Sequence, residues 1–190
     1  ELLRQLIEAS LAAQEQERVR AEAGGSGQSA LVIGGGGRMG QWFARFLDAQ
    51  GYAITVADPA GCPDGFSSVT DWRTLALDFD LVMVETAGIG QSDSEIVDLV
   101  DFPVYVMTSD YGAPSQLEKI DMLDFAELVV LNKYDKRGAE DALRDVRKQW
   151  KRNRVAFNVA DEDVPVYPTI ASQFNDPGIS WMFANLCRLM

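Results

Sequence analysis

Residues 30–40 read ALVIGGGGRMG, a short apolar run that ends in glycines and passes directly into a helical pattern. An apolar run without alternation is typical of a strand that is covered on both faces. The glycines allow a sharp turn, and residues 39–49 then show helical periodicity that ends at Gly51. The segment predicts a strand, a tight turn and a helix, which is the opening unit of a parallel α/β sheet.

The rest of the chain repeats this alternation. Apolar runs predict five more strands, and helical patterns predict four more helices. The strands are expected at 53–57, 81–84, 104–107, 128–131 and 166–169, and the helices at 92–99, 115–125, 138–150 and 177–189. Residues 60–76 are expected to be irregular, with one helical turn near residues 71–73. We predict a three-layer α/β sandwich with a mainly parallel sheet of about six strands, Rossmann-like or phosphate-loop NTPase-like. The second strand could lie beside the first or be displaced outward.

The N-terminal residues differ in character from the rest. Residues 1–23 carry leucines and an isoleucine at helical spacing among Glu, Gln and Arg, and they predict an amphipathic helix that packs on the domain. Residues 24–29 contain Gly-Gly-Ser-Gly and predict a flexible linker. Residues 30–190 are then expected to form a single α/β domain.

Composition excludes several functions. A net charge of −12 argues against nucleic acid as a partner. No apolar run is long enough to span a bilayer, so we expect no membrane partner. No secretory signal pattern is present, so we expect a cytoplasmic protein if the chain is natural. The absence of histidine excludes Ser-His-Asp and Cys-His catalysis. Cys62 and Cys187 lie far apart in sequence and predict neither a disulfide nor a metal pair.

The glycine turn has the spacing of a dinucleotide-binding motif. Gly35, Gly37 and Gly40 follow a strand and open a helix, and Arg38 and Met39 lie between the last two of these glycines. The helix N-terminus would offer N–H groups to a pyrophosphate. Asp58 closes the second strand, where a carboxylate accepts hydrogen bonds from an adenosine ribose. These residues predict binding of NAD or NADP, with Asp58 favouring NAD. A tight turn without a ligand is the alternative.

Residues 30–62, including LVIGGGGRMGQWFARFLDAQGY, resemble the nucleotide-binding part of prephenate dehydrogenases, especially those joined to a chorismate mutase. That family oxidises prephenate with NAD(P) and a catalytic histidine. This sequence has no histidine, so the resemblance implies cofactor binding at most.

From residue 79 onward the sequence resembles a different family. The stretches DLVMVETAGIGQSDSEIVD, YVMTSDYGAPSQLEKIDMLDFAELVVLNKYDKRGAEDALRDVRKQW and PVYPTIASQFNDPG are similar to the G domain of fused isobutyryl-CoA mutases. They also resemble the separate chaperone GTPases of methylmalonyl-CoA mutase. In those proteins GTP hydrolysis gates the delivery of adenosylcobalamin to the mutase.

This second resemblance implies roles for residues that follow the predicted strands. Asn132 and Asp135 would read guanine through its O6 edge and its N1 and N2 groups, and the stem of Lys133 would pack over the base. Ala171 and Ser172 would offer a backbone N–H to O6. Glu85 would hold a water bound to Mg²⁺, and Gly88 would be the hinge of a loop that senses the γ-phosphate.

The two halves do not combine into a complete GTPase. The turn Gly34–Gly40 contains no lysine and no hydroxyl, the groups that neutralise phosphates and hold Mg²⁺ in phosphoryl transfer. We therefore expect no meaningful GTP hydrolysis and only weak binding of GDP or GTP with Mg²⁺. The simplest interpretation is an engineered hybrid without catalytic activity, joined near residues 75–79, that binds at most NAD(P) or an anion.

Two alternatives to the hybrid stay open. The chain could be a degenerate guanine-nucleotide-binding chaperone domain of a cobalamin-dependent acyl-CoA mutase. In that case a mutase would be its partner, provided that the G-domain surface is intact. It could also be a folding scaffold that binds no ligand.

Overall fold

The computed structural model describes residues 27–62, 65–86, 95–111, 114–173 and 175–189, which belong to two compact units. The N-terminal unit is Glu1–Ala87 and the C-terminal unit is Gly88–Met190. The predicted helix over residues 1–23 and residues 24–26 of the predicted linker lie outside the described residues. The expectation of a single domain over 30–190, with a seam near 75–79, stays a prediction.

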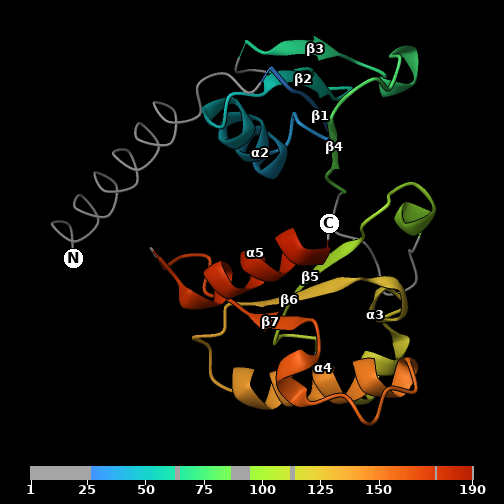
Figure 1. The fold of residues 1–190 in the computed structure, drawn as a ribbon, viewed down its shortest axis with the longest axis vertical. Helices are drawn as coiled ribbons and strands as arrows, with labels where there is room; N and C mark the ends of the chain where they lie inside the picture. The colour runs from blue at the N-terminus through green and yellow to red at the C-terminus, as the bar shows by residue number, and fades with distance from the viewer. Residues whose placement is uncertain (1–26, 63–64, 87–94, 112–113, 174, 190) are drawn as a thin grey trace, which may run out of the picture. The chain divides into compact units, whose positions relative to one another are not determined.

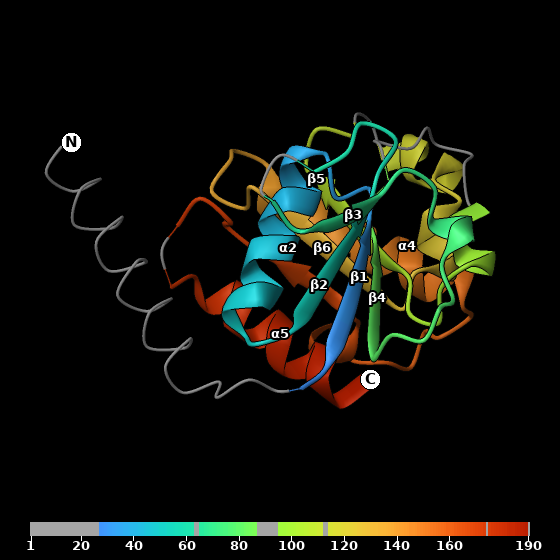
Figure 2. The same ribbon diagram turned by 90° about the horizontal axis from the view of Figure 1, so that it is seen from above.

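The N-terminal unit is built on a four-stranded parallel sheet with the order β3-β2-β1-β4 (Figure 2). Its elements are β1 (Ser29–Ile33), α2 (Arg38–Ala49), β2 (Ala53–Ala57), β3 (Ser67–Val69), the 3₁₀ helix η1 (Trp72–Thr74) and β4 (Leu81–Val84). The α2 residues Phe43, Ala44 and Leu47, spaced for one helix face, pack on apolar side chains of β1 and β2.

The C-terminal unit is built on a three-stranded parallel sheet with the order β5-β6-β7. Its strands are β5 (Val104–Thr108), β6 (Leu128–Asn132) and β7 (Val166–Pro168). Its helices are η2 (Glu95–Asp98), η3 (Pro114–Lys119), α3 (Met122–Phe125), α4 (Ala139–Asn153), η4 (Asp161–Asp163) and α5 (Pro177–Leu189).

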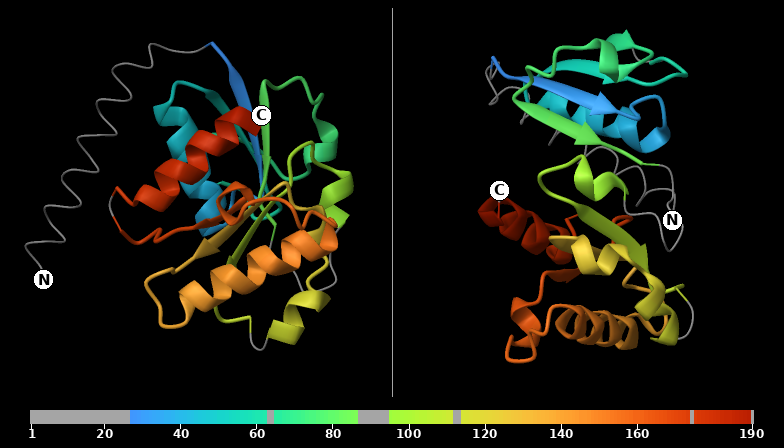
Figure 3. Two further views of the ribbon diagram at one scale, coloured as in Figure 1. Left: turned by 60° about the horizontal axis from the view of Figure 1, so that its bottom comes forward. Right: turned by 90° about the vertical axis from the view of Figure 1, so that its right-hand side faces the viewer.

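This second unit is a three-layer sandwich, with α4 and α5 on opposite faces of the sheet (Figures 1 and 3). Alternate β6 residues face opposite ways. Val129 and Leu131 join the cluster that includes Val146 of α4, whereas Leu128 and Val130 pack with Met182 of α5. Because both faces are covered, the strand reads as a continuous apolar run.

The ends of α4 and α5 are fixed by local chemistry. In α4, acidic residues occupy the first turn and Lys151 and Arg152 the last, which complements the helix dipole. In α5, Asp176 precedes Pro177 and its Oδ2 accepts a hydrogen bond of 2.9 Å from the N–H of Ile179. Oδ2 also accepts a hydrogen bond from the N–H of Ile170, at 3.2 Å, so one buried carboxylate ties the helix start to the loop after β7.

The α/β class and all six predicted strands are confirmed, but three details differ. The strands form two sheets of four and three, and residues 67–69, expected to be irregular, pair with β2 as β3. This exposed three-residue edge strand has no apolar run to reveal it. In the described part of the two predicted helices 92–99 and 115–125, residues 95–98 and 114–119 form 3₁₀ turns and residues 122–125 form one short α-helix. The position of the second strand is settled, since β2 pairs directly with β1.

The turn between β1 and α2 depends on close backbone contacts. Gly34 has φ +82°, and a Cβ built on it would approach the carbonyl oxygen of Glu85 to 2.5 Å. A Cβ on Gly40 would lie 2.2 Å from the carbonyl oxygen of Gly34. Both glycines are therefore required to seat the helix against the strand ends.

A pair of alanine substitutions tests this packing. Gly40→Ala should lower the free energy of unfolding by about 1–3 kcal/mol, because its Cβ meets immobile backbone atoms. Gly37→Ala should cost less than about 1 kcal/mol, since Gly37 has φ −71° and its Cβ would have no contact closer than 3.6 Å. Urea denaturation followed by circular dichroism measures both, and equal losses would contradict the packing role of Gly40.

Candidate functional site

The predicted nucleotide residues fall into two groups, one in each unit. Gly35, Gly37, Arg38, Met39 and Gly40 lie in the turn and first helical residues of the N-terminal unit, with Asp58 and Glu85 beside them. Asn132, Lys133, Asp135, Ala171 and Ser172 lie in the C-terminal unit, in the loops that follow β6 and β7. Gly88 lies outside the described residues.

Asp58 lies against the glycine turn. Its Oδ2 accepts a hydrogen bond of 2.9 Å from the N–H of Gly36, and its Oδ1 accepts one of 2.8 Å from the N–H of Ala60. The carboxylate thereby occupies one of the turn N–H groups that an anion would use. Oxygen lone pairs remain for a ribose hydroxyl, because each carboxylate oxygen accepts more than one bond.

Glu85 approaches the same turn from the end of β4. Its backbone N–H donates to Ile33 at 2.9 Å, and its Oε2 would lie 3.1 Å from a Cβ built on Gly34. Two carboxylates therefore flank the turn, whereas its one basic side chain, Arg38, is exposed. The residues present do not fit the magnesium–phosphate site of a phosphate loop, because the turn supplies neither a lysine nor a hydroxyl. In the described part of the chain, no three acidic or Cys side chains cluster to hold a metal.

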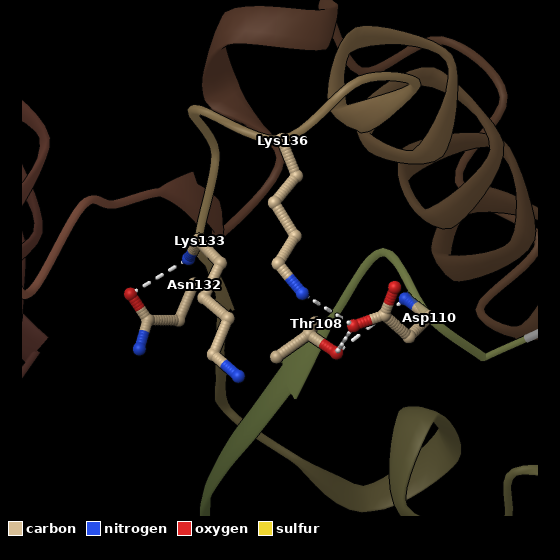
Figure 4. A network of polar contacts seen from close by, with 5 residues as sticks. All are labelled: Thr108, Asp110, Asn132, Lys133 and Lys136. Carbon is tan, nitrogen blue, oxygen red and sulfur yellow. Dashed lines mark hydrogen bonds and ion pairs between the residues drawn. The ribbon is translucent and has the colours of Figure 1, made fainter.

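Asn132 is the centre of the C-terminal group. Its Oδ1 accepts a hydrogen bond of 2.8 Å from the backbone N–H of Lys133 (Figure 4). It also accepts one of 3.1 Å from the backbone N–H of Ala171. The Thr169 hydroxyl lies 3.4 Å from the same oxygen. Because these N–H groups can only donate, the amide oxygen must face them, and the amide nitrogen is left as a donor.

The loop after β6 is held in an unusual conformation. Lys133 has φ +59°, a left-handed value that few residues other than glycine adopt, and Gly138 has φ +84°. The N–H of Tyr134 donates to Thr169 at 3.0 Å, which ties the loop to the end of β7. Lys133 and Asp135 are both exposed, and Asp135 makes no ion pair or hydrogen bond with the residues that the structure describes. The carboxylate is free to accept bonds from a ligand.

The backbone N–H of Ala171, expected to meet guanine O6, is already engaged. It donates to Asn132 Oδ1 at 3.1 Å, so a base oxygen would have to share it. The N–H of Ser172 has no such bond to the described residues and is the simpler donor. The expectation that Ala171 or Ser172 serves O6 stays a prediction, with Ser172 favoured.

Sequence reasoning missed three residues beside this loop. Lys136 Nζ lies 3.1 Å from Asp110 Oδ2, and the Thr108 hydroxyl lies 3.4 Å from the same oxygen. The hydrogen bond from Lys136 and its charge lower the pKa of Asp110, and the Lys133 ammonium adds to this shift. Burial raises the pKa of the neighbouring Tyr111 to about 12, so its hydroxyl stays neutral at ordinary pH. Nothing in the separate patterns around residues 110 and 136 could have paired them.

The family model of the methylmalonyl-CoA mutase-associated GTPase MeaB matches residues 61–180. The chain belongs to the MeaB family. Both cysteines of this MeaB-family chain are free. Among its described helices none is long and apolar enough to cross a membrane.

Relatives of this MeaB-family chain include two fused isobutyryl-CoA mutases. The protein of Cupriavidus metallidurans is 58% identical over 108 residues, which are 57% of this chain and 10% of the relative. That of Geobacillus kaustophilus is 54% identical over 111 residues, 58% of this chain and 10% of the relative. The GTPase ArgK of Escherichia coli is 37% identical over 60 residues, 32% of this chain and 18% of the relative. The chain thus spans about a tenth of the fused mutases that it matches.

The family match divides the two groups of candidate residues. Glu85 and all five residues of the C-terminal group lie inside residues 61–180, whereas the glycine turn and Asp58 lie before them. The predicted resemblance of the second half to mutase-associated G domains is confirmed, and it begins upstream of residue 79. The resemblance of residues 30–62 to prephenate dehydrogenases and the fused origin of the chain stay predictions.

The two hydrogen bonds that Asn132 Oδ1 accepts give a testable prediction. Asn132→Ala removes the acceptor for two N–H groups and should lower the free energy of unfolding by about 1–2 kcal/mol. Asn132→Asp keeps the acceptor oxygen and should stay within about 0.5 kcal/mol of the wild type. Thermal denaturation at matched pH compares them. An alanine variant as stable as the wild type would show that the side chain does not hold the two loops.

Proposed function

We propose that the C-terminal unit recognises the base of a guanine nucleotide. The proposal rests on the hydrogen-bonding groups that Asn132 and Asp135 leave unused. The Asn132 side-chain oxygen accepts bonds from the protein backbone, and its amide nitrogen is left as a donor. The exposed Asp135 carboxylate is unpaired among the described residues and is left as an acceptor.

This pair of groups suits guanine better than adenine. Guanine presents N7 and O6 as acceptors, which an amide N–H matches. Its N1–H and N2 amino groups donate to a carboxylate, whereas adenine has an acceptor at N1 and no amino group at C2. Membership of a GTPase family supports the same assignment.

We further propose that the glycine turn of the N-terminal unit does not act as a phosphate loop, so that the phosphates contribute little to binding. Asp58 already accepts the Gly36 N–H, and Glu85 adds a second negative charge beside the turn. Phosphoryl transfer needs positioned cations at the phosphates, and none of the turn residues is a lysine. We therefore expect no GTP hydrolysis at a measurable rate.

An acyl-CoA mutase is the partner that the relatives support. Two of them are named as fused isobutyryl-CoA mutases, and the family is named for its association with methylmalonyl-CoA mutase. We propose that this chain acts as a guanine-sensing part of a mutase assembly, in the manner of a degenerate chaperone domain.

Recognition of the base without the phosphates can be tested by comparing the dissociation constants of guanosine, GMP and GDP. Guanosine, GMP and GDP should bind with dissociation constants within about threefold of one another, on the order of 1 mM, with no dependence on Mg²⁺. Adenosine should bind at least tenfold more weakly. Calorimetric or NMR titration measures these constants, and Asp135→Asn should weaken guanosine binding by about tenfold.

The alternatives predict different titrations. If GDP binds a hundredfold more tightly than guanosine, a phosphate site operates and that part of the proposal is wrong. If neither guanosine nor GDP binds at 10 mM, guanine recognition itself is wrong. Glu140→Gln serves as the control, because Glu140 is an exposed carboxylate in the first turn of α4.

A second candidate function rests on the N-terminal unit. We propose NAD as its ligand, because the order β3-β2-β1-β4 is that of a dinucleotide fold and brings Asp58 to the glycine turn. Gly37, the N-cap of α2, has no side chain to satisfy the first N–H groups of the helix. Those groups would face the pyrophosphate.

Cofactor titration tests this candidate. At a hundredfold excess over its dissociation constant, NAD⁺ should stabilise the protein by about 2.7 kcal/mol, and NADP⁺ should do less. Asp58→Asn should reduce the preference for NAD⁺ over NADP⁺, because it removes the charge that repels a 2′-phosphate. Thermal shift measures this, with the ligand-free melt of each variant as control. No stabilisation by either cofactor at 10 mM would remove the candidate.

A further inference from the structure

An ion pair joins the carboxyl ends of β5 and β6. Lys136 Nζ lies 3.1 Å from Asp110 Oδ2, across a pair of strands in which Thr108 is the register partner of Asn132 (Figure 4). The Thr108 hydroxyl lies 3.4 Å from the Asp110 carboxylate and within the same distance of the Asp110 N–H. The turn after β5 is thus shaped around the carboxylate that receives Lys136.

The loop after β6 is anchored on its other side by different bonds. Asn132 Oδ1 accepts from Ala171 and the N–H of Tyr134 donates to Thr169, both beyond β7. Among the described residues, the Lys136–Asp110 pair is the side-chain bond that ties this loop to β5. A loop held from both sides cannot swing toward either neighbour without breaking a bond.

The two residues proposed to contact the base lie between the bonds to the β7 side and the ion pair to Asp110. Lys133 and Asp135 are exposed, and the N–H of Lys136 donates to the carbonyl of Lys133 at 3.0 Å, which closes a turn around both. The position of Lys136 therefore sets the position of the Asp135 carboxylate. The bond from Tyr134 to Thr169 and the ion pair of Lys136 with Asp110 both act on the turn over residues 133–136.

We propose that Lys136 and Asp110 are positioning residues that hold the turn over residues 133–136 in its base-reading geometry. The inference rests on the proposed recognition of guanine by Asn132 and Asp135. Neither residue of the pair needs to contact the base, and Asp110 acts only through Lys136.

The effect of the pair on binding should be modest and specific. Exposed ion pairs change an equilibrium by about 1.4- to 5-fold. Lys136→Met should weaken guanosine binding by about two- to fivefold. It should weaken inosine binding less, because inosine lacks the 2-amino group that Asp135 would accept from. The ratio of the two affinities reports where Asp135 lies, and a loss of global stability would not change it.

The experiment combines guanosine and inosine titrations with amide hydrogen exchange of the full chain. Lys136→Met and Asp110→Asn should both lower the guanosine-to-inosine affinity ratio and speed exchange of the Tyr134 and Lys136 amides. Lys136→Arg and the swapped pair Asp110→Lys with Lys136→Asp should restore both. Asp141→Asn, which breaks the exposed ion pair with Arg144 on α4, is the matched control.

The outcomes separate this inference from the function on which it rests. Unchanged exchange of the Tyr134 and Lys136 amides in Lys136→Met would overturn the positioning role, whatever the ligand affinity. Faster exchange with an unchanged affinity ratio would also overturn it, because the pair would then hold the loop without serving the base. If the wild type bound no guanosine, the proposed function would fail, while the exchange rates would still decide whether the pair fixes the loop.

Discussion

The C-terminal unit depends on the orientation of one amide group. Asn132 Oδ1 accepts the N–H groups of Lys133 and Ala171, and so joins the loop after β6 to the loop after β7. The first bond compensates for the left-handed backbone of Lys133, and the second brings a distant segment to the same edge. Since the oxygen is committed to these bonds, the nitrogen is presented outward. Structural support and the proposed ligand recognition would therefore use the two ends of a single side chain.

The glycine turn of the N-terminal unit depends on close backbone packing instead of on a side-chain amide. Its glycines admit backbone contacts that no Cβ would allow, and the Asp58 carboxylate satisfies the Gly36 N–H from within the protein. A phosphate loop instead directs its N–H groups and a lysine at the ligand. In this turn one N–H is bonded to Asp58 and a second carboxylate, Glu85, lies nearby, so the turn differs from a phosphate loop in charge. Close packing alone thus accounts for the glycines at positions 34 and 40. The spacing of glycines is therefore weaker evidence for a bound nucleotide than the charges of the side chains around the turn.

Apolar runs predicted the strands well because burial on both faces leaves a signal in every residue of the run, as in Leu128–Asn132. The same reasoning missed β3, whose three residues owe their pairing with β2 to tertiary contacts. Motif resemblance pointed to Asn132, Lys133 and Asp135, because their proposed roles follow from nearby positions in one loop. It could not find the contact between Asp110 and Lys136, which are 26 positions apart and meet only through strand register. It also could not show that the Ala171 N–H is already bonded, since that depends on the rotamer of Asn132.

A site with few contacts is more sensitive to positioning than a site with many. In a complete G domain, phosphate and metal contacts hold the nucleotide, and a small shift of the base loop costs a minor share of the binding free energy. Here the proposed contacts reduce to an amide, a carboxylate and a lysine stem, each worth about 1–3 kcal/mol at most. Binding at millimolar concentration corresponds to about 4 kcal/mol in total. An anchor that changes affinity two- to fivefold then accounts for a larger share of the binding free energy than it would in a complete G domain. Loss of the phosphate half would therefore increase the importance of the anchors around Asn132.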